Sequence, residues 1–340
     1  MPHPSAIGVF SGLGGLEIGL QKAGFKIQCS LDSDVDCCRS LRMNHRRRRV
    51  IRRDISEISG NELLRGAQIR RGSLALLAGG PPCQPFSRSN EGRRRGLRDS
   101  RGRLVWEMVR LADETEPRII LIENVPGFIS AEGGSVIRQL VKDLAGLGYS
   151  VEYSLLDSAS YGIPQRRKRL FVVGTRTDAM FQFPSPTHGP GLNPYVTAKD
   201  AIGDLDDGIT RRGADSIGGK YGHLVDAIPE GMNYLYYTKE VGYPKPRFRW
   251  RSKYWHFLLK LDRNQPSSTI QANPGPYVGP IHWRNRHLTL REAMRIQTLP
   301  DNIKVSGSRG TAWQQIGNAV PPVLAEAVGL QLCKNILTSI

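Results

Sequence analysis

Short runs of apolar residues alternate with helix-like spacing along the first half of the chain. The apolar runs are typical of buried strands, and we expect strands at Ala6–Phe10, Lys26–Leu31, Leu74–Ala78, Ile119–Ile122 and Leu170–Gly174. Amphipathic spacing predicts helices at Gly15–Ala23, Val35–Met43, Leu104–Glu114 and Val136–Leu147. This alternation is typical of βαβ units, so the sequence predicts an α/β fold with a doubly wound, mostly parallel sheet. In such folds, ligands bind at the carboxyl ends of the strands.

The alternation is lost between about residues 183 and 282, where Pro, Gly, Asp and aromatic residues dominate. We interpret this segment as part of a second, smaller and irregular domain. Regular spacing returns at Thr289–Leu299, and Pro322–Ile336 is typical of a helix, since Pro is favoured at a helix start. We therefore expect a large domain formed by residues 1–178 and 315–340, and a small domain formed by residues 179–314.

Composition adds one strong signal, the charge. The chain has 340 residues, which allows about two domains, and 48 Lys and Arg against 31 Asp and Glu give a formal net charge of +17. An excess of this size predicts a polyanionic partner such as nucleic acid. A basic but merely solvated surface is the alternative.

The five cysteines form no pattern of paired spacings, so we predict neither a disulfide framework nor a zinc site, and we expect no metal. The N-terminus lacks the basic and apolar regions of a signal peptide, and no uninterrupted apolar run approaches about 18 residues. We therefore expect a cytoplasmic protein. Only nine residues precede Phe10, so we expect no appended domain at this end.

A glycine-rich turn, Phe10–Gly15, directly follows the first expected strand and opens the first helix. Small residues let the backbone approach a ligand there, while the helix N–H groups face it. A dinucleotide fingerprint would need Gly where Glu17 stands, so the turn favours a cofactor without phosphate. Asp32 and Asp54, each expected near a strand end, are candidates for ribose hydroxyls and an adenine amino group. Plain turn and helix-cap roles are the alternatives.

The segment Gly79–Ser87 begins with two glycines and two prolines that fix the backbone just before Cys83. A structural cysteine would lie within the preceding apolar strand, where burial raises the thiol pKa and leaves it inert. At a strand end beside a basic loop the thiolate is favoured, so we interpret Cys83 as a nucleophile. A buried, unreactive cysteine is the alternative.

Six segments resemble, in order, the motifs of the DNA cytosine-5 methyltransferases. They are Phe10–Gly15, Pro82–Gln84, Glu123–Val125, Gln165–Arg169, Arg286–Glu292 and Gln315–Val320. The resemblance covers the chain apart from about residues 185–262. It implies the Rossmann-like fold of methyltransferases that use S-adenosylmethionine, with the small domain as the target recognition domain.

The resemblance also implies roles in the chemistry. C5 of cytosine is a poor nucleophile, so the thiolate of Cys83 would first add to C6 and make the ring an enamine. Glu123, with a raised pKa, would contact N3 and the exocyclic amine. Arg169 would hold O2, and Arg167 would brace the site. A strand-end ion pair for Glu123 and nonspecific phosphate binding by the arginines are the alternatives.

S-adenosylmethionine is the implied cofactor and methyl donor. The residues that would line its pocket are Phe10, Gly12, Leu13, Gly14, Gly15, Asp32, Asp54, Ile55, Pro82, Leu104 and Asn318. The family usually has glutamate where Asp32 stands, and the shorter side chain should still reach the ribose.

Double-stranded DNA is the implied partner, bound in a positive cleft with its target base flipped out of the stack. The stretch Arg88–Arg103 matches the family's loop that closes over DNA, with a solvated loop as the alternative. Arg46–Arg49, Arg52 and Arg53 form a further basic run that either touches phosphates or is solvated. The candidate DNA-binding residues are Ser89, Arg93, Arg94, Arg95, Arg247, Arg249 and Arg251.

We therefore expect a DNA (cytosine-5)-methyltransferase of the bacterial restriction–modification type, acting as a monomer, with a cognate restriction endonuclease that acts separately. A tRNA cytosine-5 methyltransferase is one alternative, and the long recognition segment favours DNA over it. A catalytically silent DNA-binding relative is the other, and intact Cys83, Glu123 and Arg169 argue against it.

Overall fold

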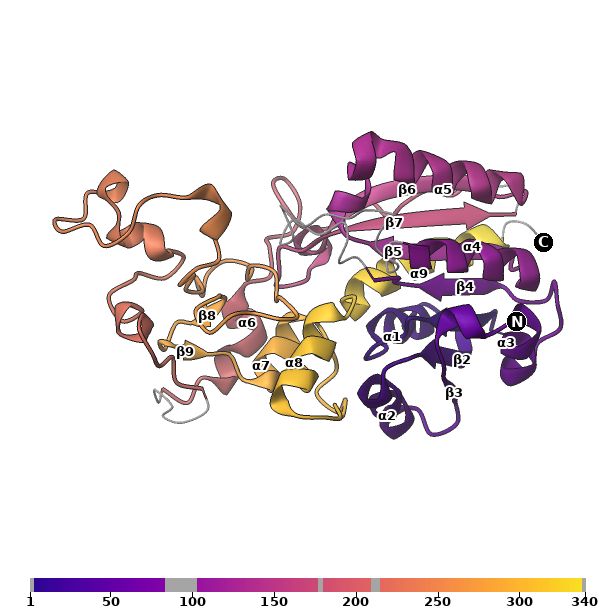
Figure 1. Cartoon of the computed structure of the whole chain (residues 1–340), viewed down its shortest axis with the longest axis horizontal. Coiled ribbons are helices and arrows are strands. Elements are labelled where there is room, and N and C mark those ends of the chain that lie inside the picture. Colours follow the sequence, from indigo (N-terminus) through magenta and orange to yellow (C-terminus); the bar gives the residue numbers. More distant parts are fainter. Residues whose placement is uncertain (1–2, 83–102, 177–179, 209–214, 338–340) are drawn as a thin grey trace.

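The computed structural model describes residues 3–82, 103–176, 180–208 and 215–337. Within these residues a seven-stranded sheet has the order β3-β2-β1-β4-β5-β7-β6 (Figure 1). β1 to β5 pair in parallel, and β7 runs antiparallel to both β5 and β6. The predicted doubly wound, mostly parallel α/β fold is confirmed. The strands are β1 Ser5–Val9, β2 Lys26–Asp32, β3 Arg49–Arg52, β4 Leu76–Gly79, β5 Ile119–Asn124, β6 Ser150–Asp157 and β7 Lys168–Thr175.

Helices cover both faces of the sheet. Ile120 and Ile122 of β5 share a buried cluster with residues of α3, α4 and α5, whereas Ile119 and Leu121 pack with residues of α1 and α9. A strand covered on both sides reads as a continuous apolar run, and this is what marks β5 in the sequence. The helices are α1 Gly15–Lys22, α2 Val35–Asn44, α3 Gly60–Ala67, α4 Leu104–Thr115, α5 Ser135–Gly146 and α9 Pro322–Leu337.

Two edge strands, β3 and β6, and helix α3 lie outside the predicted elements. β3 reads Arg-Val-Ile-Arg, and β6 leaves Tyr153 and Leu155 exposed. Each strand ends the sheet on one side. Edge strands carry charged and polar residues that discourage pairing with other chains, so they lack the apolar run that marks a central strand.

α1 and α9 approach closely because glycines face the joint. A Cβ at Gly19 would lie 2.2 Å from the carbonyl oxygen of Pro322, and one at Gly15 would lie 2.3 Å from that of Val320. Leucines of α1 and α9 share one buried cluster with the sheet. The last helix of the chain thus packs on the first, against one face of the sheet (Figure 1).

One stretch, Arg309–Lys334, is by length and composition alone apolar enough to cross a membrane. It comprises two helices, α8 (Arg309–Asn318) and α9, separated at residues 319–321. The most apolar part of this stretch is 61% buried inside the fold. Its apolar composition is that of core helices.

The described residues between 180 and 318 form a second lobe with little regular structure (Figure 1). It holds α6 (Ala198–Ile202), α7 (Leu290–Ile296), α8 and a hairpin of β8 (Ile281–His282) and β9 (Arg286–His287). The expected boundary between residues 314 and 315 falls inside α8. Edge-to-face aromatic contacts take the place of regular packing in this lobe. The cluster comprises Tyr221, Tyr234, Tyr236, Tyr237, Tyr243, Phe248, Phe257 and Tyr277.

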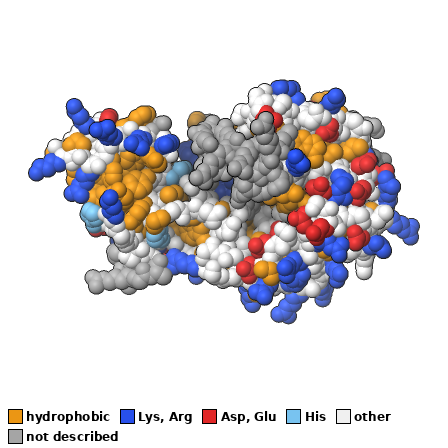
Figure 2. All heavy atoms as spheres, viewed as in Figure 1, with side chains coloured by type: hydrophobic (Ala, Val, Ile, Leu, Met, Phe, Trp, Pro, Cys, Tyr) orange, Lys and Arg blue, Asp and Glu red, His pale blue; other side chains and the backbone are white. Residues whose placement is uncertain are grey.

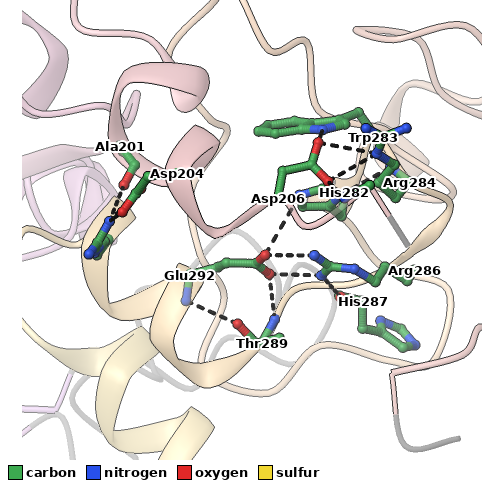
Figure 3. Close-up of polar contacts among 12 residues, drawn as sticks. Ala201, Asp204, Asp206, His282, Trp283, Arg284, Arg286, His287, Thr289 and Glu292 are labelled. Atoms are coloured by element: carbon green, nitrogen blue, oxygen red, sulfur yellow. Dashed lines mark hydrogen bonds and ion pairs between the residues drawn. The ribbon is translucent and has the colours of Figure 1, made fainter. Parts of the chain in front are cut away.

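A buried ion pair ties the β8–β9 hairpin to α7 (Figure 3). The guanidinium of Arg286 donates to both carboxylate oxygens of Glu292, at 2.8 and 2.6 Å, and both side chains are 1% exposed. Glu292 also accepts from the N–H of Thr289, which closes a capping box at the start of α7. Burial lowers the pKa of the neighbouring His282 to about 4, so its ring is neutral near pH 7. Arg286 and Glu292 therefore carry the opposite charges of this cluster.

We expect Gly19→Ala to destabilise the fold by about 1–3 kcal/mol, because the added methyl group would overlap the carbonyl of Pro322. Gly146→Ala is the matched control, since this helical glycine has no atom within 4 Å of an added Cβ. It should leave stability unchanged or raise it by up to about 1 kcal/mol. Urea unfolding followed by circular dichroism measures both, and equal effects would contradict the close approach of α1 and α9.

Glu292→Gln should lower the free energy of unfolding by about 3–5 kcal/mol, because the guanidinium of Arg286 would stay buried without its carboxylate. The control is Glu326→Gln, which removes an exposed pair with Lys22 at 3.9 Å and should cost less than about 1 kcal/mol. Thermal unfolding compares the variants with the wild type. If Glu292→Gln proves as stable as Glu326→Gln, the pair does not hold the hairpin.

Candidate active site

The glycine turn after β1 is held by the end of β2. Oδ2 of Asp32 accepts from the N–H of Gly12 at 2.7 Å, and Oδ1 accepts from the N–H of Asp34 at 2.9 Å. Gly12 and Gly14 have φ values of +54° and +87°, which glycine reaches without a steric penalty. Burial raises the pKa of Asp32, and the two N–H donors oppose this shift. Asp32 thus fixes the shape of the turn.

Space and an unsatisfied hydroxyl lie at this turn. An added Cβ at Gly12 would have no atom within 4 Å among the described residues. Oγ of Ser11 is buried and has no hydrogen-bond partner in the part of the chain that the structure describes. Buried polar atoms nearly always have a partner, so this turn has both room and a free hydrogen-bonding group for a ligand.

Three of the predicted cofactor residues face the core instead of this space. Leu13 is buried against α7 and α8, and Ile55 is buried under α3 and α4. The backbone of Gly15 faces the carbonyl oxygen of Val320. If these residues contact a cofactor, they do so through the backbone.

The remaining predicted cofactor residues keep some exposure. Asp54 is exposed after β3, where its carboxylate accepts from the N–H of Ser56 at 2.9 Å and from its hydroxyl at 2.7 Å. These hydrogen bonds lower the pKa of Asp54, so the carboxylate is ionised at neutral pH. The others are half-buried or, at the end of α8, exposed: Phe10, Pro82, Leu104 and Asn318.

The last residues of β5 fix the loop that follows β4. A Cβ at Gly80 would lie 3.0 Å from Oε2 of Glu123, so a larger residue there would require this carboxylate to shift by a few tenths of an ångström. Nδ2 of Asn124 donates to the carbonyl oxygen of Pro81 at 3.4 Å. Gly80 and Pro81, which lead to Cys83 in the sequence, are therefore in contact with Glu123 and Asn124.

Five of the predicted site residues lie outside the described residues. They are the nucleophile Cys83 and the loop residues Ser89, Arg93, Arg94 and Arg95.

Glu123 and Arg169 form a buried ion pair. Nε of Arg169 lies 2.9 Å from Oε1 of Glu123, and the two side chains are 14% and 12% exposed. Because β7 runs antiparallel to β5, the first residues of β7 lie beside the last residues of β5, with Asn124 opposite Leu170. Burial raises the pKa of Glu123, and the guanidinium groups of Arg169 and Arg167 oppose this shift. Glu123 thus forms the strand-end ion pair that was the alternative to a catalytic role, but the arginine it pairs with is Arg169, which is itself expected in the site.

Arg167 is fully buried at the junction of the two lobes. Its Nη1 donates to the carbonyl oxygen of Ile270 at 3.0 Å, and its Nη2 donates to those of Gly317 at 2.7 Å and Ala319 at 3.3 Å. These carbonyls belong to the small lobe and to the end of α8. A guanidinium suits this place because its rigid fork serves several acceptors at once.

A glutamine relay lies beside Arg167. Nε2 of Gln165 donates to Oε1 of Gln297 at 2.9 Å, and Nε2 of Gln297 donates to the carbonyl oxygen of Ile316 at 2.7 Å. Oε1 of Gln165 accepts from the N–H of Ile270. Segments separated by up to 152 residues therefore meet at one buried junction.

Arg48 corrects the expectation for the basic run at residues 46–49. Its side chain is 5% exposed and pairs with Glu17, so it neither touches phosphate nor is solvated. Glu17 also accepts from the hydroxyl of Ser30 at 2.7 Å and is buried beneath the glycine turn. A buried carboxylate needs a charged partner. Glu17 stands where a dinucleotide fingerprint has glycine, and this departure is the feature of the sequence that could have indicated such an ion pair.

The three arginines expected to contact DNA in the small lobe are exposed. Cζ of Arg247 lies 5.7 Å from the centre of the Tyr237 ring, and Cζ of Arg251 lies 5.9 Å from the centre of the Tyr254 ring. Arg249 is exposed between Phe248, which packs in the aromatic cluster, and Trp250, which is 54% exposed. This segment thus contributes both to the core of the lobe and to its surface.

Comparison with known proteins identifies the family. Residues 5–334 match the family model described as C-5 cytosine-specific DNA methylase. The chain belongs to this family. It is 33% identical to the type II methyltransferase M.SacI of Streptomyces achromogenes, over 95% of this chain and 90% of that protein. It is also 33% identical to the type II methyltransferase M.NgoFVII of Neisseria gonorrhoeae, over 98% and 86%.

Solved structures agree on the fold of this cytosine-specific methylase. One described as a prophage-encoded DNA modification methyltransferase of E. coli has a TM-score of 0.71 and 24% identity, covering 98% of this chain and 99% of that one. The S. pombe Dnmt2 methyltransferase has a TM-score of 0.60 and 18% identity, covering 97% and 98%. The predicted function, a type II DNA (cytosine-5)-methyltransferase, is confirmed by the family and by its type II relatives.

Proposed function

We propose that this enzyme transfers the methyl group of S-adenosylmethionine to C5 of a cytosine flipped out of duplex DNA, through a covalent adduct with Cys83. The observation that carries the proposal is the buried pair of Glu123 and Arg169. The carboxylate of Glu123 packs against Gly80, which precedes Cys83 by three residues in the sequence. An acid and a guanidinium are thereby brought to the ends of neighbouring strands, next to the segment that precedes Cys83 in the sequence.

The glycine turn suits S-adenosylmethionine. When bound, this cofactor supplies an electrophilic methyl group on a sulfonium and carries no phosphate. The turn also lacks the third glycine of a dinucleotide fingerprint, because Glu17 stands there and is buried with Arg48. The space at Gly12 and the free hydroxyl of Ser11 are consistent with a ligand there. The residues that would hold it are Phe10, Gly12, Gly14, Asp32, Asp54, Pro82, Leu104 and Asn318, with backbone contacts from Leu13, Gly15 and Ile55.

The side chains divide the work on the cytosine ring. The thiolate of Cys83 forms a bond to C6, and the ring electrons move toward C5. Glu123 gives its proton to N3 as this charge develops, which its raised pKa favours, while Arg169 holds O2. After C5 is methylated, N3 returns its proton to Glu123 and C5 gives its proton to water. The bond between C6 and sulfur then breaks, which restores the aromatic ring and the thiolate.

Arg167 acts as a positioning residue. Arg167 immediately precedes β7 and donates to main-chain carbonyls at the junction. These hydrogen bonds hold the start of β7, and with it Arg169, in place. The orientation of Arg169 toward Glu123 then follows from the register of β7 with β5.

Duplex DNA would lie between the two lobes, with residues 179–314 as the target recognition domain and residues 1–178 with 315–340 as the catalytic domain. The net charge of +17 and the exposed Arg247, Arg249 and Arg251 support this placement. Ser89 and Arg93–Arg95 would close over the DNA. We further propose a cytoplasmic monomer that protects its host against a separately acting restriction endonuclease.

Cys83→Ser should abolish methylation while leaving DNA binding within about twofold, because the hydroxyl is not ionised at neutral pH. Bisulfite sequencing of DNA from cells that express the wild type first identifies the methylated site. A duplex with 5-fluorocytosine at that site should then give a covalent complex that survives denaturing gels with the wild type and with the control Cys333→Ser. Appreciable turnover by Cys83→Ser would refute the nucleophile, and labelled methyl transfer to tRNA instead of duplex DNA would refute the substrate.

The pH dependence tests Glu123. Its protonated form is the active one and burial raises its pKa, so kcat should be full below that pKa and fall as pH rises through it. Glu123→Gln cannot release a proton, so we expect a kcat lower by about 10²–10⁴ and without that decline. Single-turnover rates across pH 6 to about 9 measure both. A decline that persists unchanged in Glu123→Gln would belong to another group.

A further inference from the structure

The positive charge of the chain is concentrated around one edge of the sheet. Residues 35–72 hold eleven arginines and four acidic residues, a net charge of +7 out of the total of +17. They form α2, β3 and α3, at the end of the sheet formed by β3. Figure 2 shows Lys and Arg side chains gathered over the part of the large lobe where Figure 1 draws α2 and β3.

Among the described residues, most of these arginines have no acidic partner. Arg48 is buried with Glu17, and Arg53 pairs with Glu62 at 3.0 Å. Within the described part of the chain no ion pair engages seven exposed ones: Arg42, Arg46, Arg47, Arg49, Arg52, Arg65 and Arg70. By contrast, Arg110, the basic residue of α4, bonds both Glu107 and Glu114. The charge at the β3 edge is therefore available to a partner.

Three arginines converge on a hollow between β3 and α3. The hollow has a volume of about 520 Å³, and its lining includes one carboxylate, that of Glu62, which pairs with Arg53. The lining residues are Arg49, Ile51, Arg53, Ile58, Glu62, Arg65, Gly66 and Gln68. Residues 49, 51 and 53 share one face because side chains alternate along the extended chain. We name the exposed Arg46, Arg47, Arg49, Arg52, Arg53 and Arg65 the arginine edge.

The arginine edge is separate from the catalytic residues. Glu123 and Arg169 lie on β5 and β7, and β2, β1 and β4 intervene between β3 and β5. Four strand spacings amount to about 19 Å, close to the width of a duplex. Arg49 pairs in register with Cys29, three residues before Asp32, so Arg46 and Arg47 lie toward the amino ends of the strands.

We propose that the arginine edge is a second duplex-binding surface, which holds a DNA segment outside the catalytic crevice. Its guanidinium groups, of which all but that of Arg53 have no ion pair among the described residues, match a phosphate backbone. Binding there would therefore be independent of sequence and driven by counterion release. An enzyme with two such surfaces passes from one duplex segment to another without first leaving the DNA. The inference rests on duplex DNA as the substrate and not on the chemistry of Cys83.

The test compares two triple variants that remove the same charge. Arg46→Gln/Arg47→Gln/Arg49→Gln alters the arginine edge. Arg118→Gln/Arg138→Gln/Lys142→Gln is the control on exposed positions before β5 and on α5, toward the other end of the sheet. Each lowers the formal net charge of +17 by three. Circular dichroism and thermal unfolding verify that both variants fold.

Transfer between duplexes is the deciding measurement. A fluorescein-labelled short duplex with one target site is bound, and its release is followed while unlabelled random-sequence duplex is increased. For the wild type and the control, release should speed up with competitor, because the competitor binds the arginine edge first. For the edge variant, release should be independent of competitor, and the slope of log K against log salt for random duplex should fall by about 2–3.

Methylation of the short duplex separates this inference from the catalytic proposal. The edge variant should keep the wild-type kcat and KM on it, because the short duplex fills only the catalytic crevice. Competitor-dependent release equal to that of the wild type would overturn the inference and leave a solvated basic surface. A loss of methylation on the short duplex would overturn it too, by placing the edge within the catalytic DNA contact.

Discussion

The structure depends on how one buried guanidinium is satisfied. Arg167 is 1% exposed, and the free energy of burying its charge is offset by main-chain carbonyls of Ile270, Gly317 and Ala319. These acceptors come from the small lobe and from the break between α8 and α9. The two lobes and the last helix are thus fixed to β7 by one side chain, and the neighbouring amides of Gln165 and Gln297 extend the contact.

The reversal of one strand has a direct chemical result. In a wholly parallel sheet, the first residues of a strand lie far from the carboxyl ends of its neighbours. β7 enters antiparallel, so Arg169 near its start meets Glu123 near the end of β5. Both groups are largely buried, and in that setting their attraction is much stronger than in water. The arginine holds the carboxylate in place while burial keeps the carboxyl pKa high.

The sequence predicts the central strands and most helices well because burial on two faces leaves continuous apolar runs, as at Ile119–Asn124. It misses β3 and β6, whose edge positions need no such run, and β3 is hidden among arginines. The motif segments point to Glu123, Arg167 and Arg169 as site residues. Their ordering along the chain carries no information on which atoms meet.

Contacts between distant segments explain the rest. The pair of Glu17 with Arg48 and the hydrogen bond of Gln165 to Gln297 depend on tertiary geometry. Gln165 opens a motif segment, but nothing in the sequence points to Gln297 as its partner. Gly80 illustrates the same point: the sequence indicates a backbone fixed by glycines and prolines, whereas the close approach at Gly80 is that of the Glu123 carboxylate, 43 residues later in the chain.

The position of α9 sets an order on biosynthesis. Leu16 and Leu20 leave the ribosome about 300 residues before Leu324 and Val328, the side chains that cover them. Until then the nascent sheet presents one bare apolar face, the kind of surface that chaperones bind. The acceptors for Arg167 at the end of α8 follow Arg167 by about 150 residues. The two lobes can therefore be locked together only after α8 and α9 have been made, and a ribosome stalled before them carries a half-built sheet and no assembled crevice.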